Sequence, residues 1–283
     1  GKDQMKAELK IAWRYLFAKK QFNAIHIITA ISSAAVGVVT AAMVCILSVM
    51  NGFGVMVEQM FSQFDPDIRV VAKAGKSFSI SEEKKTALLD LPCVDLLSES
   101  VSETALVYFE DKQMPVQLMG VDSAFADLTD IENIITDGHY EVHDGAFDRA
   151  VLGQGLAWKL GIGAHFITGL HVYAPKRHGK VNMLRPDMNF NREGCFIAGT
   201  FAVNQQKYDD NLMLVDIGLA RRLLDYSEDE VTALNLAIAE GYSIKQAKRE
   251  ITSILGEEYK LLDRYEQQED FFRILRVEKL LTT

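Results

Sequence analysis

An uncharged apolar stretch near the amino end is the strongest pattern in the chain. No Lys, Arg, Asp or Glu occurs from Gln21 to Val57, and the core of this stretch, from Ala24 to Met50, reads AIHIITAISSAAVGVVTAAMVCILSVM. As a helix this core would extend roughly 40 Å, compared with roughly 30 Å for the hydrocarbon of a bilayer. We therefore predict a transmembrane helix at residues 23–52. A cleaved secretory signal is the alternative, but its apolar region would be only about 7–15 residues long.

Charged residues on the two sides of this stretch indicate its orientation. The first 20 residues carry six basic and two acidic side chains, whereas Glu58, Asp65 and Asp67 follow on the other side. Because basic flanks stay in the cytoplasm, we predict a cytoplasmic amino terminus and an extracytoplasmic main domain. Residues 1–22 also contain an amphipathic pattern with Trp13 next to basic residues, which favours an interfacial helix on the cytoplasmic surface.

Small residues recur on one face of the predicted membrane helix. Ser33, Gly37 and Ala41 are spaced four residues apart, which places them one above another in an α-helix. Small side chains let neighbouring helices approach closely in lipid, where burial of apolar surface gives no driving force between helices. We therefore predict that these three residues pack against other membrane helices.

Beyond the apolar stretch, strand patterns and helix patterns alternate irregularly. We predict strands at Asp67–Ala72, Val101–Phe109, Met114–Gly120, Leu170–Tyr173, Cys195–Phe201, Leu212–Asp216, Ala233–Ile238 and Lys260–Asp263. We predict helices at Phe53–Phe64, Ser81–Leu91, Ser123–Leu128, Gln154–Leu160, Ile217–Asp225, Ser243–Leu255 and from Glu266 onward. Ser81 and Ser243 are expected helix caps, and Glu110 opens the turn of a hairpin. This mixture predicts an α+β domain after one amino-terminal transmembrane helix.

One segment between the predicted strands has little periodicity. Residues 174–194 read APKRHGKVNMLRPDMNFNREG and gather basic side chains, among them Lys176 and Arg177, in a chain whose net charge is −9. Long segments without secondary structure inside compact domains are usually functional or disordered. We predict a loop that binds a partner, with a solvated flexible loop as the alternative.

Three glycine or histidine motifs fail to complete a catalytic or binding site. Gly75-Lys76-Ser77 resembles the end of a nucleotide-binding loop, but Val70 stands where that loop requires a glycine. Gly153-Gln154-Gly155 starts like a dinucleotide fingerprint, but Trp158 occupies the third glycine position, so we interpret it as a turn into a helix. His139, His143 and Asp144 have metal-ligand spacing, but glycines flank them and favour a loop.

Composition narrows the chemistry further. We predict no catalytic residue, no cofactor and no metal, and therefore no enzyme in this chain. The acidic net charge argues against a nucleic-acid partner. Cys93 and Cys195 follow the membrane segment, where disulfides can form, but sequence does not indicate a pair and we predict none.

Several segments together resemble a known family. They are residues 7–53 (AELKIAWRYLFAKKQFNAIHIITAISSAAVGVVTAAMVCILSVMNGF), FSQFDPDIRV at 61–70, QLMGVD at 117–122, LGQGLAWKLGI at 152–162, IAGTF at 197–201 and RVEKLL at 276–281. This combination resembles the amino-terminal part of bacterial lipoprotein-releasing permeases of the LolC and LolE type, which share a superfamily with MacB and FtsX.

The resemblance implies an architecture and a set of partners. It implies a porter-like periplasmic core at residues 53–105 and 232–268, an inserted β-rich lobe at 106–231, and a helix at 269–283 leading to a second membrane helix. It also implies an inner-membrane protein whose partners are a cytoplasmic ABC ATPase, a second permease subunit, membrane lipid, and a lipoprotein cargo or periplasmic carrier. The ATPase would hydrolyse ATP, and the permease would transmit the motion to its periplasmic domain.

The resemblance also assigns a role to the loop at 174–194. A hook loop stands at this place in the LolC type, which makes Met183, Leu184, Arg185 and Pro186 its expected tip, with Lys176 and Arg177 near its base. Two alternatives stay open. One is a MacB-like or FtsX-like task, namely export or control of a cell-wall hydrolase; the other is a single-pass anchored periplasmic binding or sensor domain.

Overall fold

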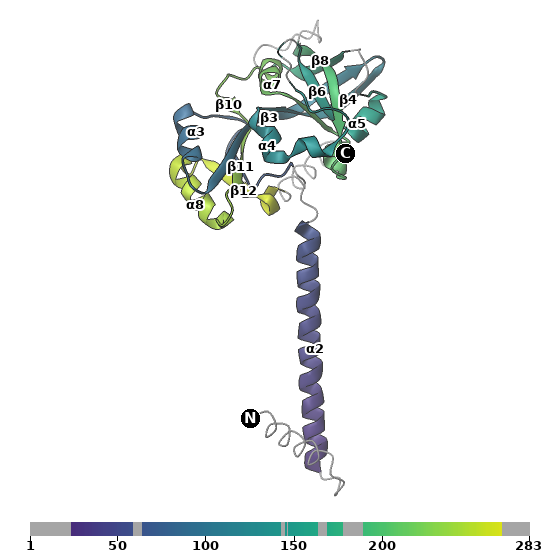
Figure 1. The fold of residues 1–283 in the computed structure, drawn as a ribbon, viewed down its shortest axis with the longest axis vertical. Helices are drawn as coiled ribbons and strands as arrows, with labels where there is room; N and C mark the ends of the chain where they lie inside the picture. Colours follow the sequence, from purple (N-terminus) through teal and green to yellow (C-terminus); the bar gives the residue numbers. More distant parts are fainter. Residues whose placement is uncertain are drawn as a thin grey trace. The chain divides into compact units, whose positions relative to one another are not determined.

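The computed structural model describes residues 24–58, 64–142, 145, 147–163, 169–177 and 189–267 (Figure 1). The chain divides into two compact units, Gly1–Met60 and Phe61–Thr283. The predicted interfacial helix at 1–22 and the predicted helix at 269–283 lie outside the described residues. The two units are described separately below.

The first unit contains one long helix, α2 (Ala24–Glu58), of 35 residues. Within it, Ile27–Met50 is long and apolar enough to cross a membrane, and none of this span is buried by the protein itself. The helix continues through Asn51-Gly52, where we predicted a break before a separate helix starting at Phe53, so that part of the prediction is wrong. A helix satisfies its backbone hydrogen bonds internally in lipid. The sequence through Asn51-Gly52 carries no charged or proline residue that would end the helix there.

The second unit is built on one large mixed sheet. The strands pair in the order β12-β1-β11-β3-β4-β9-β6-β8-β5, and β7 pairs with both β3 and β8. The bounds are β1 Ile68–Ala72, β3 Val94–Phe109, β4 Lys112–Val121, β5 Ile135–Gly138, β6 Arg149–Gly153, β7 Leu170–Pro175, β8 Phe190–Phe201, β9 Leu212–Asp216, β11 Ala233–Ile238 and β12 Tyr259–Asp263. A small separate sheet joins β2 (Phe78–Ser79) to β10 (Glu230–Val231).

Part of this sheet closes on itself. β3 pairs with β4, β4 with β9, β9 with β6, β6 with β8, β8 with β7, and β7 again with β3. The resulting ring encloses apolar side chains such as Val107, Leu118 and Val172, each fully buried, together with residues of α5 (Gln154–Leu160) and α7 (Ile217–Leu224). We call this the α7 cluster. Closure gives each of these six strands two neighbours in the ring, while β12 and β5 remain at the two ends of the sheet.

A second apolar cluster lies on the other half of the sheet. α3 (Glu82–Leu89) and α8 (Ile244–Leu255) cover β1, β11, β12 and the beginning of β3, and Figure 1 shows both helices beside these strands. Leu88 of α3 and Ile251 of α8 are fully buried in it. The predicted caps form, because Ser81 Oγ accepts from Lys84 N and Ser243 Oγ accepts from Gln246 N. We call this the α8 cluster.

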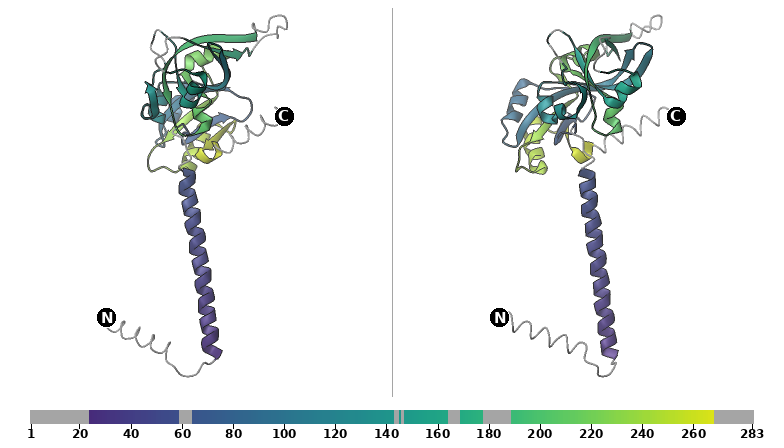
Figure 2. Two further views of the ribbon diagram at one scale, coloured as in Figure 1. Left: turned by 90° about the vertical axis from the view of Figure 1, so that its right-hand side faces the viewer. Right: turned by 45° about the vertical axis from the view of Figure 1, so that its right-hand side comes forward.

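A third cluster surrounds Phe64. It contains Phe125 of α4 (Ala124–Thr129), Ile131 of the short 3-10 helix η1 (Ile131–Ile134), Phe201 of β8 and, at its border, Tyr208 of α6 (Gln206–Asp209). We call it the α4 cluster. The long strand β3 connects the regions, since it pairs with β11 at one end and with β4 and β7 at the other (Figure 2).

The structure confirms the predicted α+β class and most predicted elements, with three kinds of difference. β3 begins at Val94 and not at Val101, while β5, β6, α6, β2 and β10 were not predicted at all. β7 and β8 extend into the segment 174–194, which is therefore loop over a shorter range than predicted. β6 was missed because its sequence RAVLG, intermediate and then buried throughout, does not alternate. Our division into a core and an inserted lobe at 105/106 and 231/232 stays a prediction.

Candidate functional site

The two ends of the predicted partner-binding loop are fixed by a strand pair. β7 and β8 are antiparallel from Leu170 opposite Cys195 to Pro175 opposite Phe190. One further backbone hydrogen bond extends this ladder, from Lys176 N to Asn189 O at 2.8 Å. The predicted tip, Met183, Leu184, Arg185 and Pro186, lies outside the described residues. The described base is a rigid support, and Lys176 is exposed on it.

Arg177 follows directly and contacts the body of the domain. Its guanidinium forms an ion pair with Glu230 at 2.7 Å, donates to Ser77 Oγ at 2.9 Å, and lies 4.2 Å from the ring centroid of Tyr226. Its backbone N–H donates to Asp225. We predicted Arg177 as a partner-binding residue, and that prediction is untested; the structure shows its exposed side chain in contact with the domain at the base of the loop.

Glu230 is held in its charged form at this base. Burial would raise the pKa of Glu230, but the hydrogen bonds from Ser77 and Arg177 and the charge of Arg177 lower it below the ordinary value. The side chain of Glu230 is 16% exposed, so its pair with Arg177 is partly shielded from solvent. Tyr226, stacked under Arg177, donates its hydroxyl to Glu103 of β3 at 3.3 Å. The base of the loop is therefore fastened to β3 and β10.

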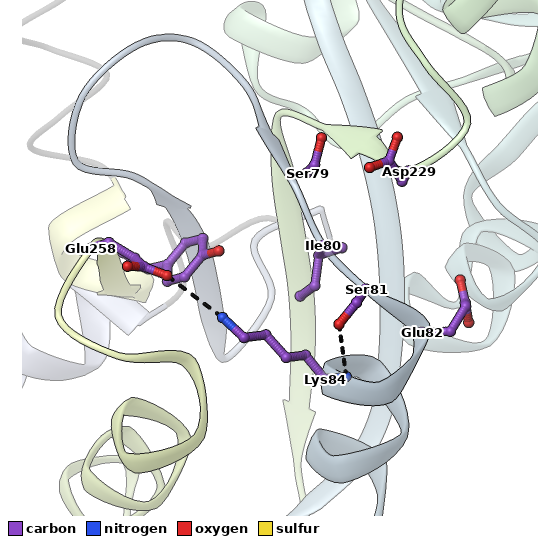
Figure 3. Close-up of a pocket in the computed structure, with 8 residues that line it drawn as sticks. Ser79, Ile80, Ser81, Glu82, Lys84, Asp229 and Glu258 are labelled. Atoms are coloured by element: carbon purple, nitrogen blue, oxygen red, sulfur yellow. Dashed lines mark hydrogen bonds and ion pairs between the residues drawn. The ribbon is translucent and has the colours of Figure 1, made fainter.

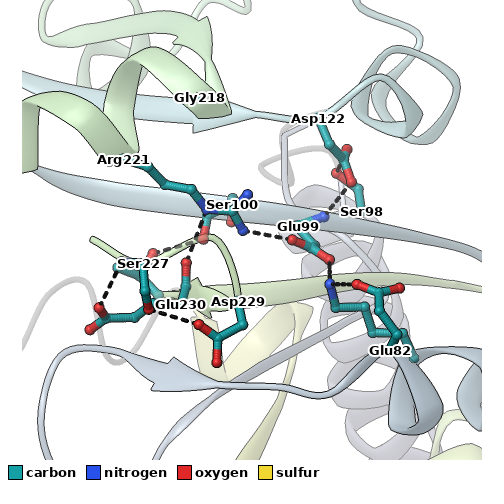
Figure 4. Close-up of polar contacts among 12 residues, drawn as sticks. Glu82, Ser98, Glu99, Ser100, Asp122, Gly218, Arg221, Ser227, Asp229 and Glu230 are labelled. Atoms are coloured by element: carbon teal, nitrogen blue, oxygen red, sulfur yellow. Dashed lines mark hydrogen bonds and ion pairs between the residues drawn. The ribbon is translucent and has the colours of Figure 1, made fainter. Parts of the chain in front are cut away.

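A charged network lies next to this base (Figure 4). Glu99 of β3 forms ion pairs with Lys85 of α3 and, at 2.8 Å, with Arg221 of α7. Lys85 also pairs with Glu82 at 2.6 Å. Burial would lower the pKa of Lys85, but the hydrogen bonds that it donates to Glu82 and Glu99 raise the pKa above the ordinary value. The network joins a helix of the α8 cluster to a helix of the α7 cluster through one carboxylate.

One face of the strands beside the loop carries aromatic side chains, of which Tyr108 and Tyr173 are half-buried and Phe190 and Phe196 are exposed. Tyr108 and Tyr173 contact edge to face at 5.0 Å, and the Arg192 guanidinium lies 5.6 Å from the Tyr173 ring. The pairing register puts Phe190 and Phe196 on the same face, and these are 41% and 37% exposed. We name these five residues the aromatic face. Sequence reasoning missed it because Phe190 and Arg192 were assigned to the loop.

The small-residue face of α2 is open along its length. Ser33, Gly37 and Ala41 are all exposed, and a Cβ atom added at Gly37 would meet no other atom within 4 Å. The predicted packing of this face against other membrane helices stays a prediction.

A groove lies between α3 and the start of β12 (Figure 3). Two of its charged groups pair with each other: Lys84 lies 3.5 Å from Glu258 and 5.5 Å from the ring centroid of Tyr259. Ser81 in the groove caps α3. The contacts of Lys84 join α3 to the start of β12.

The motifs rejected from sequence have structural positions. Lys76, in the turn after Gly75, pairs with Glu103 at 3.0 Å. His139 contacts Glu141, while His143 and Asp144 lie outside the described residues. Within the described part of the chain, no group of three His, Cys, Asp or Glu side chains could hold a metal ion.

The cysteines outside α2 lie in separate parts of the domain. Cys93 is buried in the α8 cluster and Cys195 in the α7 cluster, both as free thiols. Burial raises the pKa of Cys195 to about 12. A buried thiol with a raised pKa is a poor nucleophile.

Three comparisons relate this chain to known proteins. The family of MacB-like periplasmic core domains matches residues 29–254. The lipoprotein-releasing system transmembrane protein LolE of Haemophilus influenzae is 24% identical over 243 residues, which cover 83% of this chain and 56% of that protein. The chain thus spans just over half the length of this curated relative.

Solved structures resemble the domain after α2. The periplasmic region of MacB from Actinobacillus actinomycetemcomitans superposes with a TM-score of 0.51 at 9% sequence identity, covering 72% of this chain and 91% of that one. The extracellular domain of the noncanonic ABC-type transporter YknZ from Gram-positive bacteria gives a TM-score of 0.46 at 15% identity, covering 69% and 99%. The family match and the MacB superposition agree on the fold.

Proposed function

We propose a function from one premise: this chain belongs to the family of MacB-like periplasmic core domains, which matches 29–254. On this premise it is the amino-terminal part of an ABC transporter permease that releases lipoproteins from the inner membrane, with ATP hydrolysed by a separate cytoplasmic subunit. The observation that carries the choice of lipoprotein release is the 24% identity to LolE across 83% of the chain.

The described residues support a role in which motion is transmitted and a partner is bound. α2 supplies an apolar helix with an open small-residue face for a second helix. The aromatic face and the fastened loop base supply an exposed surface of aromatic and basic groups. Tyr, Phe and Arg are the residue types enriched at the centres of protein interfaces, so this surface suits a lipoprotein or its carrier.

The test is purification of the whole gene product from bacterial membranes. We expect an ABC-type ATPase to copurify, and ATP to drive release of a lipoprotein from nanodiscs to a soluble carrier. ATPase copurification without lipoprotein release would favour the export or hydrolase-control alternative, which the same family match permits. Absence of any ATPase would refute the permease and favour an anchored sensor domain.

The small-residue face gives a narrower prediction. Gly37→Leu should reduce assembly with the other permease helices about tenfold, or 1.4 kcal/mol, because the added side chain blocks close helix approach. Copurification of the second subunit measures this, and circular dichroism should show the domain still folded. Val39→Leu, on the opposite side of α2, is the matched control. Equal assembly of both variants would contradict the packing role.

A further inference from the structure

The residues that precede β1 pack against a different part of the domain from β1 itself. We call Phe64, Asp65, Pro66 and Asp67 the junction segment; it precedes β1. Phe64 is 1% exposed and does not join the α8 cluster, to which the neighbouring strand β1 belongs. It inserts instead into the α4 cluster, 4.9 Å from the Phe201 ring and 5.1 Å from the Tyr208 ring.

Asp65 is fixed to the same region through its charge. Its carboxylate is fully buried and accepts from the Tyr208 hydroxyl at 2.6 Å, and Lys207 lies 3.6 Å away. Burial raises the pKa of Tyr208 well above its ordinary value, so this hydroxyl remains a donor. A buried carboxylate is stable only while its partners are present. Phe64 and Asp65 are thus both held by α4, α6 and the end of β8.

The other half of the junction segment is tied to the end of the domain. Asp67 accepts from Ile238 N at 2.9 Å and pairs with Arg264 at 3.2 Å. Gln267, only 5% exposed, donates its side-chain amide to Pro66 O at 2.9 Å. The junction segment is therefore held from two sides. Phe64 and Asp65 contact the α4 cluster and α6, and Pro66 and Asp67 contact Ile238, Arg264 and Gln267.

β8 connects the contacts of the junction segment to the loop base. It runs unbroken from Phe190 to Phe201, which is on the order of 35 Å at about 3.3 Å per residue. At one end of β8, Phe201 contacts Phe64. At the other end, Phe190 pairs with Pro175 of β7, next to the loop base. Its first half, Phe190–Cys195, pairs with β7, and its second half, Phe196–Phe201, pairs with β6 and, near its end, with β5. One continuous strand therefore joins the residues around Phe64 to the loop base.

We propose that Phe64 and Asp65 couple the membrane helix to the loop base, so that displacement of the chain leaving α2 acts on Phe201 and Tyr208 and moves β8 with the ring around it. This inference rests on the proposed function and names the residues that carry its motion. Both are assigned a positioning role because they are buried inside the domain. A second route runs through β1, because Arg69 donates to Phe64 O at 3.3 Å and β1 pairs with β11, which pairs with β3 of the ring.

The test uses the complete permease with its ATPase in nanodiscs. Spin labels are placed at Lys176→Cys on the loop base and Glu240→Cys after β11, with Cys45 replaced by serine. We expect the distance between the labels to change when ATP and vanadate are added. Phe64→Ala should shrink this change about threefold or more, with the ATPase rate altered by less than about twofold, as when one coupling contact is lost.

Controls separate coupling from folding. Tyr208→Phe keeps the ring against Phe64 but removes the donor to Asp65, so it should fold and still reduce the distance change. Leu88→Ala removes a fully buried side chain from the α8 cluster and should leave the change intact. If Tyr208→Phe and a folded Phe64→Ala both respond as the wild type does, the coupling is refuted. A wild type that hydrolyses ATP and releases lipoprotein without a distance change also refutes it, whereas a wild type that binds no ATPase refutes the proposed function itself.

Discussion

Replacing Glu99 with Gln is expected to lower the free energy of unfolding by about 3 kcal/mol, because breaking a buried ion pair leaves its partners uncompensated. The side chains of Glu99, Lys85 and Arg221 are only 14%, 11% and 16% exposed. Glutamine preserves the shape of the side chain and removes its charge. Lys85 would keep only Glu82, whose side chain is 86% exposed. Urea unfolding of the whole chain in detergent, followed by intrinsic fluorescence, measures the loss.

An exposed ion pair provides the control for this variant. Glu258→Gln removes the partner of Lys84, but the Glu258 side chain is 65% exposed, so the change should be under about 0.5 kcal/mol. Equal losses for Glu99→Gln and Glu258→Gln would show that burial of the network contributes nothing. The double variant with Lys85→Met should recover part of the loss, because it also removes the stranded cation.

The network also has a definite pH dependence. Because the folded pKa of Lys85 is raised, its contribution to stability is fully present below the ordinary lysine pKa of about 10.4 and is lost as the pH rises through the folded value. The wild type should therefore lose stability more steeply in that alkaline window than Glu99→Gln does. Unfolding measured across this pH range tests the sign.

Local patterns predicted the elements that depend on local physics. The uncharged stretch, the caps Ser81 and Ser243, and the hairpin around Glu110 all form, since each is decided by residues a few positions apart. Glu110 adopts a left-handed φ of 51° at the turn. β6 was missed because a strand buried on both sides lacks the alternation that identifies a strand. The first part of β3 was missed because it contains buried polar residues, Ser98 and Ser100, and its hydrophobic positions do not alternate.

The candidate site was less accessible to sequence reasoning, because its groups come from distant segments. Lys85 and Glu99 lie close in sequence, but nothing there indicates that Arg221 completes the network. Arg177 was correctly noticed as basic, yet its engagement with Glu230 depends on how β10 is placed. Phe64 ended a predicted helix, and its burial against Phe201 depends on the α4 cluster, whose members come from segments distant in the sequence.

Replacing Gly153 with Ala should destabilise the domain by about 3 kcal/mol, at the upper end of the effects of overpacking. Gly153 has φ −58° and ψ 138°, which any residue can adopt. Its requirement for glycine is one of space: an added Cβ would collide with the carbonyl oxygen of Asp209 and lie 2.6 Å from that of Tyr208. Both atoms belong to the backbone of α6, which cannot move aside without shifting the whole turn.

The matched control is Gly163→Ala, whose Cβ would approach only the Asp137 carboxylate, at 3.5 Å, and which should change stability by less than about 0.5 kcal/mol. Thermal unfolding of the two variants tests this prediction. Similar melting temperatures would mean that α6 shifts to accommodate the added methyl group without loss of stability. This result also bears on the glycine pair that resembles a dinucleotide fingerprint. Gly155 likewise lies against the end of α6, where an added Cβ would collide with the carboxylate of Asp210 and lie 3.1 Å from the carbonyl oxygen of Asp209. Both glycines therefore make room for α6, whereas the glycines of a dinucleotide fingerprint make room for a pyrophosphate. Because α6 carries Lys207 and Tyr208, the partners of Asp65, displacing it in Gly153→Ala should also loosen the junction segment.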